Sequence, residues 1–144
     1  MRCYRKDVSG GAPVPLTPAG VTRGWSARDG RTILVRMGER QWHVIVGGAQ
    51  GRPVPGDHAD DNVVGWSRDS QSVFVRSSNE VPALIDRIDL TTGARTNVRE
   101  IMPPDRTGVM MINLGRFVND GQIFSYDYWR QVTKAIVVTG VPMH

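Results

Sequence analysis

The densest group of side chains that could contact an ion or a ligand is an acidic stretch near the middle of the chain. It reads Asp57-His58-Ala59-Asp60-Asp61-Asn62. Carboxylates and an imidazole are ligands for hard cations and transition metals. However, the spacing matches no EF-hand or zinc template, and Asp and Asn are ordinary loop residues. The stretch predicts a loop before a strand, with no defined metal site, whose possible ligand contacts are Asp57, His58, Asp60 and Asp61.

A second candidate is the aromatic stretch Tyr126-Asp127-Tyr128-Trp129-Arg130. Tyr, Trp and Arg are the residues most enriched at the energetic centres of protein interfaces. On a loop after Phe124, these side chains would form a recognition patch. In a strand, alternate aromatic rings would instead pack between sheets and leave the others exposed. Both interpretations stay open for Tyr126, Tyr128, Trp129 and Arg130.

Residue spacing does not assemble a catalytic site. The segment Gly24-Trp25-Ser26-Ala27-Arg28 lacks the second glycine of a nucleophile elbow. Nothing places Asp60 and Asp127 at the separation of about 5–9 Å that glycoside hydrolysis needs. The glycines around 47–51 predict a hairpin turn, because no helix follows them as in a phosphate-binding loop. We therefore predict no catalytic residue, no metal and no cofactor.

The elements that would position these residues come from a repeat. Trp25 and Trp66 stand 41 residues apart, and each begins a segment that continues through a turn aspartate into an apolar strand. A weaker third copy starts at Phe117, 51 residues after Trp66. The ten extra residues predict an insertion in the Pro-rich segment Met102–Gly108. The repeated positions, to which we give a structural role, are Trp25, Ser26, Asp29, Trp66, Ser67, Asp69, Phe117 and Asp120.

The second half of each unit repeats as well. An apolar run that ends in small turn residues and glycine recurs over residues 4–11, 42–48, 85–93 and 134–140. A period of about 40 residues with several short strands is the signature of propeller blades. A blade cannot bury both of its faces alone, so the three consecutive apolar residues Ile33-Leu34-Val35 predict packing by neighbours on both sides.

We therefore predict an all-β chain: a partial β-propeller of about three four-stranded antiparallel blades in an open, incomplete ring. The single propeller segment 1–144 divides into the end of a preceding blade (3–16), two blades (21–54 and 62–101) and a final incomplete blade of three strands (110–140). Closed propellers have roughly four to eight blades. The open edges predict that the chain is a fragment of a larger protein, or that it completes a ring with a partner or a copy of itself.

Charge and composition exclude several other classes. The 144 residues carry 18 basic and 14 acidic side chains, a net charge of +4, but acidic residues are interleaved with the basic ones. No basic run predicts nucleic-acid binding. Cys3 is the only cysteine, which excludes an internal disulfide. No apolar run approaches the roughly 18 residues of a membrane span, and the N-terminus lacks the apolar core of a signal peptide.

The repeated pattern Trp-Ser-x-Asp-Gly, followed by an apolar strand and then by Asp-Leu-x-Thr-Gly, resembles the WD-like β-propeller repeat of TolB-type proteins. Trp25–Val35, Trp66–Val75 and Ile85–Gly93 carry it. The segment Phe124–Val141 also resembles the last blade of propellers attached to bacterial receptor-type serine/threonine kinases. That resemblance implies an extracytoplasmic, periplasmic module that senses or binds. The chain has no kinase motifs, so kinase activity is not assigned to it.

We therefore expect a non-enzymatic binding or sensor propeller that contacts a protein partner or the remaining blades of a larger protein. Two alternatives remain at this point. One is the access-gating propeller of a prolyl-oligopeptidase-type peptidase whose hydrolase domain lies elsewhere. The other is a periplasmic propeller that binds a metal or a sugar through Asp57, His58, Asp60 and Asp61.

Overall fold

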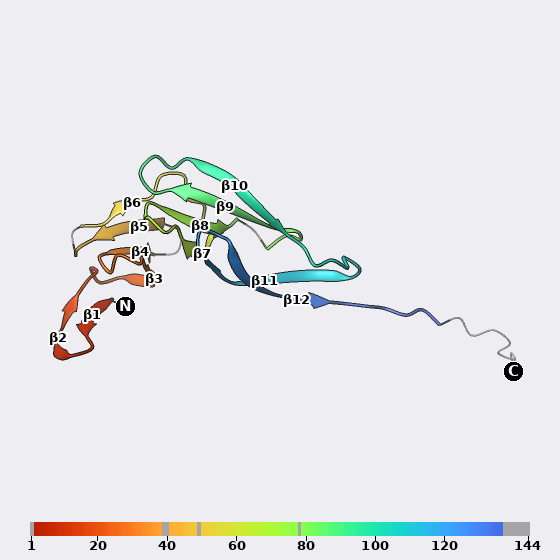
Figure 1. The fold of residues 1–144 in the computed structure, drawn as a ribbon, viewed down its shortest axis with the longest axis horizontal. Coiled ribbons are helices and arrows are strands. Elements are labelled where there is room, and N and C mark those ends of the chain that lie inside the picture. The colour runs from red at the N-terminus through yellow and green to blue at the C-terminus, as the bar shows by residue number, and fades with distance from the viewer. Residues whose placement is uncertain (1, 39–40, 49, 78, 137–144) are drawn as a thin grey trace, which may run out of the picture.

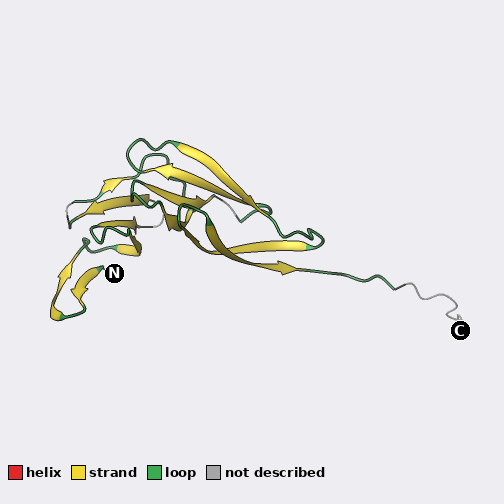
Figure 2. Cartoon of the chain, in the orientation of Figure 1, coloured by secondary structure: helices red, strands yellow, loops and turns green. Residues whose placement is uncertain are grey.

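The computed structural model describes residues 2–38, 41–48, 50–77 and 79–136, and over these ranges the chain forms four antiparallel sheets and no helix (Figure 1, Figure 2). The predicted all-β fold, an open partial propeller, is confirmed. The strands are β1 (Tyr4–Asp7), β2 (Gly10–Pro15), β3 (Val21–Ser26), β4 (Thr32–Met37), β5 (Gln41–Val46), β6 (Arg52–Pro53), β7 (Asn62–Trp66), β8 (Ser72–Arg76), β9 (Ala83–Asp89), β10 (Arg95–Ile101), β11 (Val109–Val118) and β12 (Ile123–Arg130). Two four-stranded sheets, β3–β6 and β7–β10, lie between the two-stranded sheets β1–β2 and β11–β12.

The two four-stranded sheets pack face to face through a shared apolar cluster. Leu34 on β4 and Val73 and Val75 on β8 are almost fully buried in it. Burying one such side chain stabilises a fold by about 1.5–3 kcal/mol. Each sheet buries this apolar face against the other, as the sequence predicted. The cluster consists of Leu34, Trp42, Val44, Val54, Val63, Val73, Val75, Ile88 and Leu90, with Trp25 and Trp66 packed against it.

The opposite faces of the same sheets are buried too. Ile33 and Val35, whose side chains point away from Leu34, pack with Cys3 from the N-terminal hairpin. Phe74 packs with Ile112 and Phe117 of the sheet β11–β12. Successive side chains in a strand point to opposite faces. A run of consecutive apolar residues is therefore stable only in a strand covered on both sides, as the sequence of β4 predicted.

The aspartates of the repeat form the turns predicted for them. The Asp29 carboxylate accepts hydrogen bonds from the backbone N–H groups of Arg31 and Thr32, both at 2.8 Å. The Asp69 carboxylate accepts bonds from the Ser67 hydroxyl at 2.6 Å and the Gln71 N–H at 2.9 Å. Bonds from hydroxyl and N–H donors lower the pKa of both aspartates below its usual range. The third aspartate, Asp120, instead accepts a bond from the N–H of Arg68 in the neighbouring sheet, at 2.7 Å.

The two repeat tryptophans are not equivalent positions, which corrects the alignment made from the sequence. The turns that follow them superpose with a spacing of 40 residues, since the Ala27 N–H bonds the Thr32 carbonyl as the Ser67 N–H bonds the Ser72 carbonyl. Trp25 is therefore one position out of phase with Trp66, and Ser26, which is exposed, takes the equivalent place. Because neighbours on a strand face opposite ways, both rings enter the same interface from opposite sheets.

The position predicted for the ten extra residues of the third unit is wrong. The segment 102–108 is an ordinary short connection, comparable in length with 54–61. The added length lies mainly in the strands on either side of it. β10 has 7 residues where β6 has 2, and β11 has 10 residues where β7 has 5. Longer strands keep the order of turns and apolar strands in the repeat unchanged. Residue composition therefore does not distinguish longer strands from a longer loop.

The final sheet has two strands where the sequence predicted three. After a last bond of 2.8 Å from the Gln131 N–H to the Gly108 carbonyl, residues 132–136, which include the start of the predicted third strand, continue away from β12 and belong to no sheet (Figure 1), and 137–140 lie outside the described residues. Gln131, Val132 and Thr133 follow β12 directly. This segment lacks the Gly, Asn or Asp that commonly allows a chain to reverse tightly. The second edge of β12 is therefore unpaired within the described part of the chain.

Candidate functional site

The first strands of three successive sheets line a common channel. A cavity of about 440 Å³ is bounded by segments of β3, β7 and β11. β11 lies directly against β7, where Gly65 leaves room for Phe117. Stacked sheets whose first strands face one axis form the centre of a propeller. The lining segments are 24–26 with Arg28, 63–66 and 115–118.

Three polar side chains stand at one level of this channel. Arg23, Asn62 and Asn113 are paired, in order, with the corresponding residues of the second strands, Arg36, Arg76 and Asp127. A cavity of about 300 Å³ is lined by all three polar residues. We call Arg23, Asn62 and Asn113 the polar level. Sequence reasoning missed it, because the residue types differ and each first strand contains a bulge that shifts the spacing.

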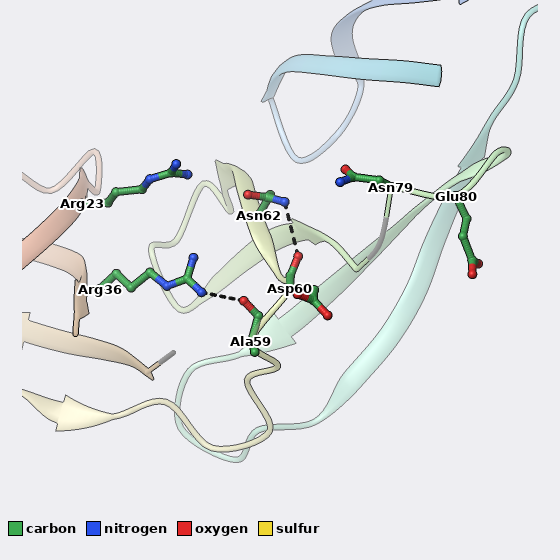
Figure 3. Close-up of a pocket in the computed structure, with 7 residues that line it drawn as sticks. All are labelled: Arg23, Arg36, Ala59, Asp60, Asn62, Asn79 and Glu80. Carbon is green, nitrogen blue, oxygen red and sulfur yellow. Dashed lines mark hydrogen bonds between the residues drawn. The ribbon is translucent and has the colours of Figure 1, made fainter. Parts of the chain in front are cut away.

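The polar level opens into a wider mouth of about 570 Å³ at the edge of the sheets. In Figure 3, Arg23 and Arg36 approach it from one side and Asn79 from the other. Asp60 and Asn62 lie between them, joined by a bond of 3.3 Å from the Asn62 amide to the Asp60 carbonyl. The mouth is lined by Arg23, Arg36, Ala59, Asp60, Asn62, Asn79 and Glu80.

Arg23 is exposed, unlike the half-buried Arg36 and the buried Arg76 near the mouth. The Arg36 guanidinium donates to the Ala59 carbonyl at 2.6 Å and lies over the Trp42 ring. The equivalent Arg76 donates to the Ile112 carbonyl of β11. The Arg23 guanidinium makes no hydrogen bond or ion pair with the described residues. It therefore presents a guanidinium to the channel that is available to a ligand.

Arg36 and Arg76 join each sheet to the next, a role that the sequence analysis did not assign. Each lies at or next to the end of the second strand of its sheet and donates to a carbonyl outside that sheet. Burial lowers the pKa of Arg76. The signal was present, since both copies of the repeat end in arginine after an apolar strand. That pattern is equally typical of an exposed strand end, so only contacts distinguish the two.

The acidic stretch mainly attaches the loop between the two four-stranded sheets to both of them through hydrogen bonds and an ion pair. The Asp57 carboxylate accepts the N–H of Trp42 on β5 at 2.9 Å. Asp61 is fully buried and accepts two bonds from the Arg95 guanidinium, at 2.8 and 3.0 Å. The His58 ring lies 3.4 Å from the same guanidinium. Of the four predicted ligand contacts, only Asp60 lines the mouth.

Arg95 also forms an ion pair with a second carboxylate, that of Asp86. Its Nε lies 2.7 Å from Asp86, and its guanidinium donates to the Ser77 hydroxyl at 2.7 Å. Burial acts to raise the pKa of Asp86, but bonds from Arg95, Ser77 and Asn97 outweigh it and hold the pKa below its usual range. The two carboxylates raise the pKa of Arg95 in turn. The network occupies the carboxylate oxygens that a bound cation would need, and within the described residues no three His, Cys, Asp or Glu side chains are placed to hold a metal.

The aromatic stretch lies in strand β12, so the loop interpretation is wrong. Tyr126 and Tyr128 stack along one face with ring centroids 6.4 Å apart, in a row that continues to Phe124 and Phe117. Arg130 ends this row over Tyr128 and pairs with Asp105 at 2.6 Å. Trp129 points to the other face and is 70% exposed. The stretch therefore divides into a stacked row whose tyrosines stay partly open to solvent, at 36% and 41% exposure, and a more exposed Trp129 on the other face.

The chain matches no protein-family model, and comparisons with curated proteins and with solved structures found no significant match. The described residues contain no helix with the length and apolar character needed to cross a membrane. The function is therefore inferred from the channel and its polar level.

Proposed function

We propose that this chain is a non-enzymatic binding module, a segment of a WD-like propeller of the TolB type, that recognises a polypeptide at the polar level of its channel. The observation that supports this most strongly is the exposed guanidinium of Arg23, which lines a cavity beside two asparagine amides and has no hydrogen-bond or ion-pair partner among the described residues. Small sets of convergent polar groups in a concavity are typical of ligand sites. A sensor role outside the cytoplasm, as in propellers attached to receptor kinases, belongs to the same proposal.

The chemistry of the polar level suits a carboxylate carried on a peptide. Arginine binds carboxylates through two parallel N–H···O bonds. The amides of Asn62 and Asn113 offer both donors and acceptors, which match a peptide backbone. Asp60 and Glu80 at the mouth disfavour a ligand with several negative charges, because like charges repel across a low-dielectric cavity. We propose one carboxylate in an otherwise neutral or basic segment.

Replacing Arg23 tests this proposal. The probes are acetyl-triglycine as the free acid and the same peptide with an amidated C-terminus, titrated into the labelled protein and followed by amide NMR shifts. The free acid should shift the amides of Gly24, Val63 and Leu114, and the amidated peptide should not. Arg23→Ala should weaken binding at least about tenfold, since a charged hydrogen bond contributes about 1.5–3 kcal/mol.

Arg31→Ala is the matched control. It removes the same charge from an exposed residue in the turn at the far end of β3 and β4, and binding should be unchanged. Equal amide shifts with both peptides, or equal losses of peptide affinity in the two variants, would show that the polar level does not recognise a carboxylate.

A further inference from the structure

The two ends of the sheet stack expose apolar surface on unpaired strands. On the C-terminal sheet, Trp129 is 70% and Ile123 59% exposed, and on the N-terminal hairpin Tyr4 is 57% exposed. Within the described residues β12 pairs only with β11, and β1 only with β2. Exposed strand edges with apolar side chains are templates for pairing with another strand.

The N-terminal hairpin corresponds to the third and fourth strands of a blade. The Asp7 carboxylate accepts the N–H of Ser9 at 2.8 Å, as the Asp89 carboxylate accepts the N–H of Thr91 at 2.9 Å at the end of the third strand β9. The Leu16 N–H bonds the Cys3 carbonyl at 2.8 Å. Its counterpart in the next sheet is the 2.9 Å bond from the Val54 N–H to the Trp42 carbonyl, between the fourth-strand end and the third strand β5.

The C-terminal sheet corresponds to the first and second strands of a blade. Its turn follows the pattern of the preceding sheet, with the Gly121 N–H bonded to the Val118 carbonyl as the Ser70 N–H is bonded to the Ser67 carbonyl. β11 lies against β7, the first strand of the preceding sheet. Among the described residues this sheet therefore lacks a third and a fourth strand, which is what the hairpin β1–β2 supplies.

The two half-blades of one chain lie at opposite ends of the stack (Figure 1). We propose that a second copy of the chain completes each of them, with β1 of one copy pairing with β12 of the other. The described residues contain twelve strands, which at four to a blade amount to about three blades, so two copies would supply a ring of about six. Closed propellers have about four to eight blades. Such a ring has the twofold symmetry that is commonest among homo-oligomers.

The complete sheet β7–β10 fixes the register of the composite blade. There the second and third strands pair Ser72 with Asp89 and Arg76 with Ile85. Ile123 takes the place of Ser72, because it closes the equivalent turn, and Asp7 takes the place of Asp89. Counting four residues along each strand sets Asp127 opposite the partner's Cys3. This register is specific to the composite blade and can be tested by a single substitution.

Asp127→Cys in the full chain should form disulfide-linked dimers with the native Cys3 under mild oxidation, seen at twice the 15.9 kDa chain mass on a non-reducing gel. Directly opposed residues in antiparallel strands are about 4.5–5.5 Å apart, within the span of a disulfide. Ser125→Cys is the matched control, since it lies two residues along the exposed strand, beyond that span. Adding Cys3→Ser should abolish the link.

Light scattering of the unsubstituted chain gives a test that does not depend on any variant folding. A mass of two chains at micromolar concentration supports the ring, and it is independent of whether Arg23 binds a peptide. A monomer whose open faces bind an apolar dye would overturn the proposal and indicate that further blades of a longer protein cover them. A ladder of larger oligomers, or equal cross-linking by Ser125→Cys, would overturn the closed ring and its register.

Discussion

Gly65→Val should destabilise the chain by about 3 kcal/mol or more, because it inserts a side chain where two sheets touch. A Cβ atom at position 65 would lie 2.9 Å from the Cβ of Phe117 and closer still to its carbonyl oxygen. The backbone of β11 cannot rotate away as a side chain can. Since β7 is the main contact of β11 outside its own sheet, the substitution should separate the β11–β12 sheet from the rest of the stack.

Urea unfolding followed by tryptophan fluorescence measures the loss in stability, and hydrogen exchange localises it. Exchange should accelerate over 109–130 and change little over β3–β6. Gly115→Ala on the facing strand β11 is the control, because its new Cβ meets the rotatable hydroxyl of Ser125 and should cost less than about 1 kcal/mol. A Gly65→Val protein as stable as the parent would show that β7 and β11 do not touch.

Arg95→Met should cost about 3–5 kcal/mol, because it leaves the fully buried Asp61 carboxylate without its ion pair. Asp61→Asn keeps an acceptor for the His58 N–H, which is bonded at 2.8 Å, and removes the buried charge. The double variant should therefore recover part of the stability, and the double-mutant cycle measures the coupling. Arg68→Met breaks an exposed pair with Asp120, for which we expect less than about 1 kcal/mol.

The same network predicts a dependence on pH. The pKa of Asp86 is lower in the folded chain than its ordinary value, so its contribution is present at neutral pH and is lost as the pH falls below about 4. Arg95→Met removes the cation that helps to lower this pKa, and the variant should show a flatter stability profile between pH 5 and 3. Additive losses in the cycle, or parallel pH profiles for parent and variant, would contradict the buried network.

Local chemistry explains which parts of the fold were predictable. Asp29 and Asp69 bond to groups two or three residues away, so the residue order alone predicts their turns. The apolar run Ile33-Leu34-Val35 likewise predicts that both faces of its strand are covered. The sheets, their strand order along the chain and their antiparallel pairing follow from features of this kind.

Long-range contacts explain which parts were not predictable. In the sequence Asp61 cannot be distinguished from other loop aspartates. Its burial depends on the ion pair with Arg95, 34 residues further along the chain. The phase between Trp25 and Trp66 depends on where each turn closes, at the Ala27–Thr32 and Ser67–Ser72 backbone bonds, which residue types do not reveal. The polar level depends on bulges at different places in β3 and β7, so the alignment of Arg23 with Asn62 and Asn113 emerges only once the strands are paired.

The central claim is that separate sheets stack face to face and turn their first strands toward one channel. Methyl–methyl NOEs in protein labelled at Ile, Leu and Val test it most directly. The account predicts NOEs that link Leu34 and Val44 to Val73 and Val75, and a separate set that links Ile85 to Ile112. A spectrum in which each four-stranded sheet shows contacts only within itself would contradict it.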